Sequence, residues 1–281
     1  MKRIYALVFG VFFSFALQAQ ELNLLWSSPA TLDIPESVLY DASSEMVFVS
    51  CLGQVRNDKT GDGYIALMNL EGEIINKEWL TGLNDPKGMA INDGKLYVSD
   101  IDELVVINIQ DAEVETRYSA PDASFLNDVT YCQNEMVFVS DSHQQHIYAL
   151  KDTTFALWLD DERLLGVNGL WAEGGNLYAG NESVWAIDPK SKSMAELFSG
   201  TGGIDGLEAI GHRNFIFSNW AGRIYVSQIG RVLLLLDTSE DELNSADIDF
   251  VPGKNMVLVP TFMGNRVDAY QLELNGKEDE E

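Results

Sequence analysis

Basic residues are scarce in this chain of 281 residues. Lys and Arg together number 18, against 44 Asp and Glu, and the formal net charge is −26. A protein that binds nucleic acid needs Lys and Arg to neutralise the phosphates, so this composition argues against a nucleic-acid partner. The acidity favours a soluble, self-repelling surface. A more specific alternative is that the acidic side chains attract cations.

Histidine and cysteine are also rare. The three His residues, His143, His146 and His212, stand in or beside predicted turns. This placement argues against a Ser–His–Asp triad and against a His-rich zinc site. The two cysteines, Cys51 and Cys132, fall in different parts of the sequence. We therefore expect two small buried side chains rather than a disulfide, although an exported chain can form one.

The apolar run at the N-terminus is too short to span a membrane. It covers Ile4–Leu17, follows the basic residues Lys2 and Arg3, and ends in a small-residue cleavage site at Ala19. This order is typical of a secretory signal peptide. The sequence therefore predicts that residues 1–19 are removed and that the mature protein is periplasmic or secreted, without a membrane span.

Two short apolar phrases recur in the same order along the rest of the chain. The first phrase occurs at Met46–Ser50, Lys95–Asp100, Met136–Asp141, Asn176–Asn181, Phe215–Trp220 and Met256–Pro260. The second follows at Tyr64–Met68, Leu104–Ile107, His146–Leu150, Val184–Ile187, Arg223–Val226 and Arg266–Tyr270. The period of roughly 40 residues is that of propeller blades with four strands. The pattern predicts an all-β, six-bladed β-propeller with four antiparallel strands in each blade.

The two ends of the repeat array complement each other. Glu21–Trp26 has the composition of a strand but belongs to no repeat, whereas the sixth repeat lacks an outer strand and ends in the acidic tail 275–281. We predict that the N-terminal strand completes the last blade, because this closes the ring and covers an open sheet edge. Residues 20–274 are then one propeller domain.

The first repeat contains the longest internal insertion, Leu52–Gly63, which we call the acidic insertion after Asp58 and Asp62. Its Asp, Asn and Gly residues have some likeness to a calcium loop, but the full alternating ligand set and the closing Glu are missing. A turn rich in Asp, Asn and Gly is the preferred interpretation.

Polar residues begin most repeats, in the same register. In a propeller the first strand of each blade lines the central channel, so equivalent positions of the repeats meet around one axis. We call them the ring residues: Glu36, Lys87, Asn127, Asn168, Asp205 and Ala246. Asp128, Glu208 and Asp247 follow closely behind them.

Four of the ring residues carry oxygen donors. Glu36, Asn127, Asn168 and Asp205 would present two carboxylates and two amides to one point, a set that suits a hard divalent cation. Ca²⁺ is the preferred candidate, with Mg²⁺, Mn²⁺ or Zn²⁺ as alternatives. Asn and Asp also favour turns without any ligand. Lys87 has three open roles, since it would neutralise the carboxylates, bind an anionic ligand group or replace the charge of the metal.

The phrases PES, LND, VNGL and IDGLE lie at the ring positions of repeats one, three, four and five. With the six repeats and the signal peptide, they resemble the senescence-marker protein/gluconolactonase/luciferin-regenerating-enzyme family, and its exported bacterial branch in particular. The resemblance covers nearly the whole mature chain. It implies a six-bladed propeller with one divalent metal in the channel and hydrolysis of sugar lactones or related esters.

The resemblance also implies roles for single residues. Glu36 and Asn168 match metal ligands of that family, Asn127 matches a residue of the substrate pocket, and Asp205 matches a metal ligand that is also the presumed catalytic base. Two departures stand out. Ser37 follows Glu36 where the family has Gly, and Phe125 occupies a position where an Arg commonly contacts the substrate.

The sequence thus supports two functions. The first is a metal-dependent hydrolase of sugar lactones or related small esters, with Asp205 as the catalytic base. Its substrate contacts would come from Lys87, Asn127, Asp128, Glu208 and Asp247. The alternative is a non-catalytic exported propeller that binds a small ligand or a protein partner.

Two tryptophans stand near the predicted site. We expect Trp171 to lie near the Asn168 site, because it follows that residue closely. Trp220 ends a second strand, and we expect it at the other end of its blade.

Overall fold

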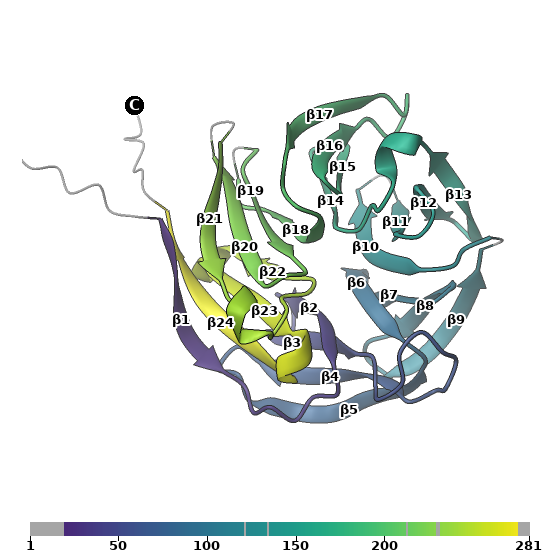
Figure 1. Ribbon diagram of the computed structural model, residues 1–281. Helices are drawn as coiled ribbons and strands as arrows, with labels where there is room; N and C mark the ends of the chain where they lie inside the picture. The colour runs from purple at the N-terminus through teal and green to yellow at the C-terminus, as the bar shows by residue number, and fades with distance from the viewer. Residues whose placement is uncertain (1–19, 121, 134, 212, 229–230, 275–281) are drawn as a thin grey trace, which may run out of the picture.

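The protein is a ring of six β-sheets. The computed structural model describes residues 20–274, except 121, 134, 212, 229 and 230. Within these residues the chain forms 24 strands in six four-stranded antiparallel sheets that surround a central axis (Figure 1). The predicted six-bladed propeller is confirmed. The predicted signal peptide, 1–19, and the acidic tail, 275–281, lie outside the described residues.

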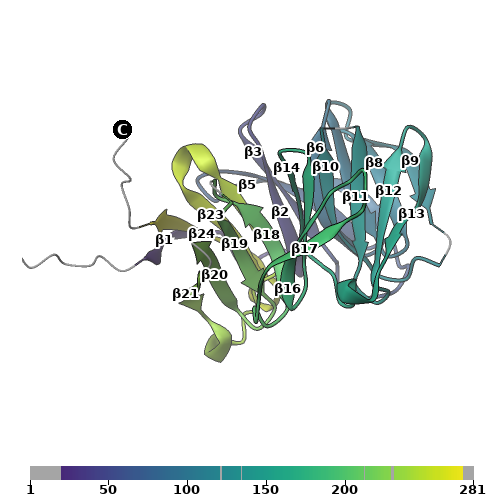
Figure 2. The same cartoon turned by 90° about the horizontal axis from the view of Figure 1, so that it is seen from above.

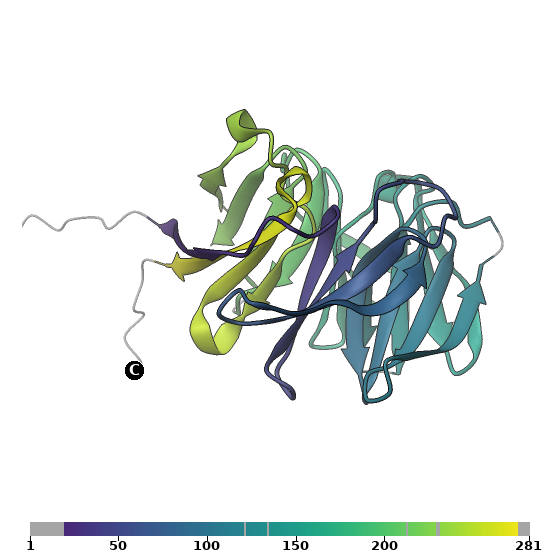
Figure 3. The same cartoon turned by 90° about the horizontal axis from the view of Figure 1, so that it is seen from below.

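Each blade is built from the axis outward, and we number the blades 1 to 6 from β2. Figures 2 and 3 show the strands from the side. The innermost strands are β2 (Pro35–Asp41), β6 (Pro86–Asn92), β10 (Leu126–Cys132), β14 (Leu170–Glu173), β18 (Ile204–Ala209) and β22 (Asp249–Val251). The second strands are β3 (Met46–Cys51), β7 (Lys95–Asp100), β11 (Met136–Asp141), β15 (Asn176–Gly180), β19 (Phe215–Asn219) and β23 (Met256–Thr261).

The outer halves of the blades follow the same order. The third strands are β4 (Gly63–Asn69), β8 (Glu103–Asn108), β12 (His146–Lys151), β16 (Ser183–Ile187), β20 (Arg223–Gln228) and β24 (Arg266–Glu273). The outermost strands are β5 (Ile74–Leu83), β9 (Glu113–Ser119), β13 (Thr154–Asp160), β17 (Met194–Ser199), β21 (Arg231–Asp237) and β1 (Glu21–Ser27). The second and third strands coincide closely with the repeated phrases of the sequence.

Helical structure in the described residues is limited to single 3-10 turns. They are η1 (Glu162–Leu164), η2 (Ser239–Asp241), η3 (Pro252–Lys254) and η4 (Phe262–Gly264). No helix in this part of the chain has the length and apolar character needed to cross a membrane.

The core consists of apolar layers between neighbouring blades. Along β3, Val47 and Val49 pack towards Leu258 of blade 6, while Phe48 packs towards Leu96 of blade 2. This follows from the strand period of two, which sends successive side chains to opposite faces. The phrases are apolar at successive positions because both faces of each blade are covered.

The N-terminal strand closes the ring. β1 pairs with β24 in the antiparallel sheet order β1-β24-β23-β22, so the predicted closure is confirmed (Figure 1). Trp26 of β1 also reaches blade 1, where its Nε1 donates a hydrogen bond of 2.9 Å to the Leu70 carbonyl. A Cβ on Gly72 would lie 2.6 Å from the Trp26 ring. The strand therefore joins blade 6 to blade 1.

The two cysteines are confirmed as buried free thiols. Cys51 ends β3 in blade 1 and Cys132 ends β10 in blade 3. Burial raises the pKa of Cys51 to about 12, so this thiol stays protonated and unreactive at neutral pH.

Candidate functional site

The beginnings of the innermost strands surround a cavity of about 380 Å³ at one mouth of the channel. We define its floor as the polar residues Glu36, Asp85, Lys87, Asn127, Asn168 and Asp205. We define its rim as Arg56, Phe125, His143, Trp220 and Phe262. The structure brings five of the ring residues together, as the repeat register predicts.

The sixth ring position differs from the prediction. Ala246 packs with Leu52 and Phe262 in a small buried cluster, and β22 begins only at Asp249. Blade 6 therefore contributes no polar side chain from its ring position to the floor. Asn168 also precedes its strand, β14, yet its N–H donates to the Gly180 carbonyl at 2.9 Å and keeps it in line with the blade.

Irregular strand starts hold the floor residues in place. The pairing register of β2, β6, β10 and β18 shifts at the ring position. In three of these blades a serine of the second strand accepts a hydrogen bond from the N–H that follows the ring residue: Ser50 from Ser37 at 3.0 Å, Ser140 from Asp128 at 2.9 Å and Ser218 from Gly206 at 2.8 Å. Such bulges re-aim side chains, and here they direct the ring residues towards the channel.

Among the described residues, two of the predicted metal-ligand side chains have a buried oxygen that accepts no hydrogen bond: Glu36 Oε2 and Asn168 Oδ1. Asn168 Nδ2 donates to Asp205 Oδ1 at 2.8 Å, which turns the amide oxygen away from that bond. Asn127 donates from Nδ2 to Ser142 Oγ at 3.0 Å. Buried polar atoms without a partner are rare and call for an explanation, such as a bound ion.

The floor carboxylates resist ionisation. Burial raises the pKa of Glu36 to about 8, Lys87 opposes this rise, and Asp205, Asp85 and Asp128 add to it. Burial also raises the pKa of Asp205 to about 7, against the hydrogen bond from Asn168 and the charge of Lys87. A cation bound among them would stabilise the ionised forms.

The donor set fits a hard divalent cation. Glu36 and Asn168 offer the unpartnered oxygens, and Asp205 and Asn127 lie in the same cavity. In the described part of the chain, no group of three or more His, Cys, Asp or Glu side chains is placed to hold a metal ion. The floor offers carboxylate together with amide oxygens, a mixture that Ca²⁺ accepts.

Asp85 is a floor residue that the sequence analysis missed. Its Oδ2 lies 3.2 Å from the Lys87 Nζ, and both side chains are buried. Its Oδ1 has no hydrogen-bond partner among the described residues. Asp85 stands two residues ahead of the expected repeat start at Lys87 and directly before β6, which begins at Pro86. An acid two positions before Lys87 was the available signal.

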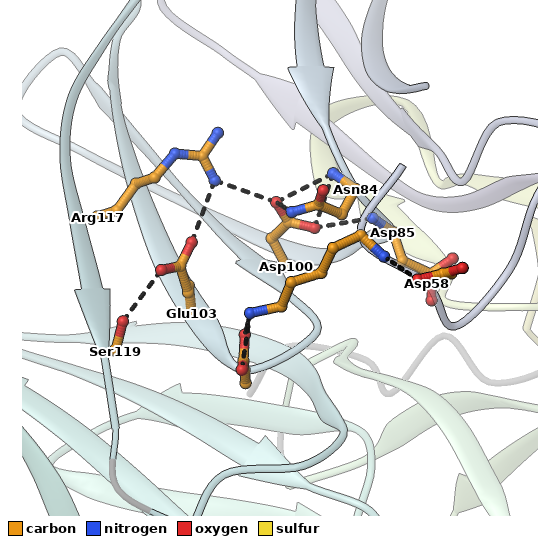
Figure 4. Close-up of polar contacts among 9 residues, drawn as sticks. Asp58, Asn84, Asp85, Asp100, Glu103, Arg117 and Ser119 are labelled. Atoms are coloured by element: carbon orange, nitrogen blue, oxygen red, sulfur yellow. Dashed lines mark hydrogen bonds and ion pairs between the residues drawn. The ribbon is translucent and has the colours of Figure 1, made fainter. Parts of the chain in front are cut away.

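A network in blade 2 fixes Asp85. Its backbone N–H donates to Asp100 Oδ1 at 2.8 Å, and the N–H of Asn84 donates to the same carboxylate (Figure 4). Arg117 donates to Asp100 Oδ2 at 3.2 Å and to Glu103 at 3.3 Å (Figure 4). Because Asp100 is fully buried and held from both sides, the position of Asp85 beside Lys87 is preorganised.

The residues behind the ring positions lie in a separate, deeper cavity. Asp128, Glu208 and Asp247 line a space of about 190 Å³ further along the channel, and they do not line the mouth. Asp128 accepts hydrogen bonds from the N–H groups of Val129 and, across the blade boundary, Leu170. Asp247 Oδ2 accepts a bond of 2.6 Å from Ser37 Oγ. Asp128 thus joins blades 3 and 4, and Asp247 joins blades 6 and 1.

The deeper cavity is strongly acidic and lacks a cation in its lining. Burial raises the pKa of Glu208 well above its usual value, and Asp249, Asp247 and Asp128 add to the rise. Burial also raises the pKa of Asp249 to about 7, although the N–H of Tyr40 donates to it. Protonation of these acids therefore stabilises the folded protein.

We expect the Glu208→Gln variant to be more stable than the parent at pH 8, with a smaller gain at pH 5. The folded state holds the Glu208 proton more tightly than the unfolded state, so stability falls as pH rises above about 4.5. The loss is at most about 1.4 kcal/mol per pH unit for one group. Gln does not titrate, so the variant lacks this pH-dependent loss of stability. Urea unfolding at both pH values measures the difference.

The exposed Glu240 provides the control, because Glu240→Gln removes a carboxylate from the surface turn η2. This variant should show the same pH dependence as the parent. An equal gain in stability for Glu208→Gln at pH 5 and pH 8 would contradict the raised pKa of Glu208 in the folded protein.

The rim residues correct two expectations. Trp220 lies at the mouth rather than at the other end of its blade, and His143 lines the same cavity. The reason is strand direction: the innermost strand leaves the mouth, so the antiparallel second strand returns to it and its following turn faces the cavity. Trp171, by contrast, lines the deeper cavity and not the Asn168 site.

His146 does not line the mouth cavity. His146 lies 3.5 Å from Asp160 in the outer part of blade 3. His212 lies outside the described residues. Among the residues that line the mouth cavity, no serine forms a hydrogen bond with a histidine that could activate it as a nucleophile.

The acidic insertion forms a hydrogen-bonded turn. Asp62 Oδ2 accepts a bond of 2.8 Å from the N–H of Gln54, and Lys59 forms an ion pair of 2.7 Å with Asp102. These contacts favour the turn over a calcium loop. The insertion has a second effect that the sequence did not reveal, since it brings Arg56 and Asn57 to the mouth cavity.

The fold and the cavity define a class: a six-bladed propeller with a polar pocket at one mouth of its channel. No protein-family model and no curated protein matches the sequence. Among solved structures, a catalytically inactive His-to-Ala variant of virginiamycin B lyase from Staphylococcus aureus, solved with quinupristin, is similar with a TM-score of 0.63 and 13% identity. The match covers 91% of this chain and 100% of that one.

Selenomethionine-substituted virginiamycin B lyase from the same organism matches with a TM-score of 0.60 and 13% identity. It covers 90% of this chain and 99% of the other. Identity this low shows a shared fold. The resemblance to the gluconolactonase-type family stays a prediction.

Proposed function

We propose that this protein is a metal-dependent hydrolase of sugar lactones or related small esters, exported to the periplasm or the outside of the cell. One observation supports this most strongly. Glu36, Asn168 and Asp205 come from three blades and meet at one cavity, where two of their buried oxygens have no hydrogen-bond donor among the described residues. A divalent cation, Ca²⁺ foremost, satisfies such oxygens.

The floor residues divide the work of hydrolysis. Glu36, Asn168, Asp205 and Asn127 would hold the cation, which would supply Lewis-acid polarisation of the ester carbonyl. The Asp205 carboxylate accepts a proton from the attacking water. The Asn168 amide keeps that carboxylate in position through its 2.8 Å hydrogen bond. Lys87 and Asn127 orient hydroxyl or carboxylate groups of the substrate.

A binding module without catalysis is the second candidate. The buried Lys87 Nζ already lies 3.2 Å from Asp85 and opposes the rise in the pKa of Glu36, so the floor contains a basic group of its own. Phe125 lines the cavity where the resembling family commonly has an Arg for its substrate. In this case the mouth would hold a small ligand or a partner's loop, without turnover.

Metal content before and after chelation tests the proposal. We expect one divalent ion in the mature protein and none in the Glu36→Gln/Asp205→Asn variant, because that variant removes both carboxylates of the donor set. Chelation should lower the melting temperature of the parent but not that of the Glu36→Gln/Asp205→Asn variant. The exposed pair Asp111→Asn/Glu240→Gln removes the same formal charge elsewhere and should retain the ion.

A metal-loaded parent should then hydrolyse members of a panel of sugar lactones, aliphatic lactones and small esters. Absence of the ion from every protein, even with added Ca²⁺, would contradict metal dependence. Persistent inactivity beside tight ligand binding would favour the binding module.

A further inference from the structure

The rim of the mouth cavity is aromatic, although its floor is charged. Phe125 and His143 stack with ring centroids 4.3 Å apart and an interplanar angle of 21°. Trp220 meets Phe262 edge to face, with centroids 4.5 Å apart. All four rings line the cavity. A ligand that reaches the floor must therefore pass between aromatic groups from blades 3, 5 and 6.

Trp220 is exposed but held in place. Its side chain is 44% exposed, whereas the Phe262 ring that supports it is only 4% exposed. A large ring fixed against a buried one loses little freedom when a ligand covers it, so it is a preorganised contact surface. Aromatic ligands gain from such a surface through edge-to-face or offset stacking.

Arg56 adds a positive charge beside these rings. Its guanidinium lies 5.6 Å from the centroid of the Phe262 ring. No carboxylate of the described residues forms an ion pair with it. The protein has a net charge of −26, and the guanidinium of this Arg lies at the mouth of the cavity without an acid partner among the described residues. A planar guanidinium binds a carboxylate through two parallel hydrogen bonds.

We infer that the mouth cavity binds a small molecule that carries an aromatic ring and a carboxylate, with the ring against Trp220 and the carboxylate at Arg56. A sugar acid would occupy the polar floor and leave the apolar rim uncovered. As a statement about the substrate, this inference rests on the proposed hydrolase: the substrate would be an aryl carboxylate that also carries an ester or lactone group, and water would cleave the ester into an acid and an alcohol or open the lactone to a hydroxy acid. As a statement about binding, it does not depend on turnover.

Calorimetric titration of the metal-loaded mature protein tests the inference with three carboxylates. 3-Phenylpropanoate has a ring, hexanoate has only an alkyl chain, and gluconate has hydroxyl groups. We expect 3-phenylpropanoate to bind about tenfold more tightly than either of the other two, which corresponds to about 1.4 kcal/mol. Comparable or weaker binding of 3-phenylpropanoate, or no binding of any of the three, would overturn the inference.

Variants assign the two contacts. Trp220→Leu should weaken 3-phenylpropanoate binding about fivefold without changing hexanoate binding. Trp220→Phe should keep most of the parent's affinity for 3-phenylpropanoate, because it retains an aromatic ring. Arg56→Ala should weaken binding of both carboxylates by about tenfold. The exposed Arg231 is the matched control, and Arg231→Ala should leave all affinities unchanged. Equal losses for Arg231→Ala and Arg56→Ala would show a general charge effect and overturn the Arg56 contact.

The hydrolase proposal and the aryl carboxylate inference can be contradicted independently of each other. Selective binding of 3-phenylpropanoate without hydrolysis of any ester would sustain the inference and overturn the hydrolase. Rapid hydrolysis of sugar lactones without preference for the aryl acid would sustain the hydrolase and overturn the inference.

Discussion

Replacement of Asp205 by Asn should lower kcat/KM for a hydrolysed lactone at least about 10³-fold. Asn cannot take the proton of the attacking water, although its side chain has nearly the shape of Asp and retains one oxygen. The effect should appear in kcat, because the proton transfer belongs to the transition state. Steady-state kinetics on metal-loaded protein measures it, and thermal unfolding checks that the variant is folded.

Asp249 supplies the control for this prediction. It is another buried channel carboxylate, it accepts a hydrogen bond of 2.6 Å from the N–H of Tyr40, and it does not line the mouth cavity. Asp249→Asn should therefore change kcat/KM less than about threefold. A folded, metal-containing Asp205→Asn variant with parental turnover would remove Asp205 from the role of base.

Replacement of Gly206 by Ala should destabilise the propeller by about 3 kcal/mol or more. A Cβ at this position would lie 2.3 Å from the backbone nitrogen of Ile248 and 2.7 Å from Asp247 Oδ1, both in the segment of blade 6 that follows the ring position. The backbone of a neighbouring blade cannot yield by such a distance without opening the contact between blades 5 and 6. In a domain of this size the melting temperature should fall by about 6–12 °C.

Gly253 is the matched control for Gly206. Nothing lies within 4 Å of a Cβ built on it, and its backbone does not adopt the left-handed conformation. Gly253→Ala should change the stability by less than about 1 kcal/mol, and a small gain is expected because Ala restricts the unfolded chain. Similar melting temperatures for the two variants would contradict the close contact at Gly206.

Gly88 and Gly169 make similar close contacts with a neighbouring blade. Gly88 faces the Asp128 backbone, where a Cβ would approach the Cα to 2.5 Å, and Gly169 faces the carbonyl of Asp205 at 2.6 Å. These glycines follow ring residues, so they permit the innermost strands to approach one another near the axis. The glycines of the phrases VNGL and IDGLE, Gly169 and Gly206, therefore reflect blade packing as well as any chemistry of Asn168 and Asp205.

The sequence by itself determined the fold and the ring register. Apolar residues at successive positions, bounded by Asn, Asp, Ser and Gly, specify strands that are buried on both faces, and their regular spacing specifies equal blades. The lone N-terminal strand and the incomplete sixth repeat determined the closure, which the pairing of β1 with β24 confirms. Equal spacing was also enough to bring Glu36, Lys87, Asn127, Asn168 and Asp205 to one cavity.

Only the tertiary structure decided which neighbours complete the site. His143 and Trp220 reach the mouth because antiparallel second strands return to it. Asp85 reaches Lys87 because Asp100, which Arg117 holds, accepts a hydrogen bond from the Asp85 backbone N–H. These contacts join residues by strand direction and blade packing, which local patterns do not encode.

The tertiary structure also decided how far along the channel each side chain lies. Asp128 directly follows Asn127 in the sequence, yet it lines the deeper cavity because successive residues of a strand point to opposite sides and a bulge changes their aim. The sequence places a residue in a blade and a register, whereas its depth and its partners depend on how six blades pack around one axis.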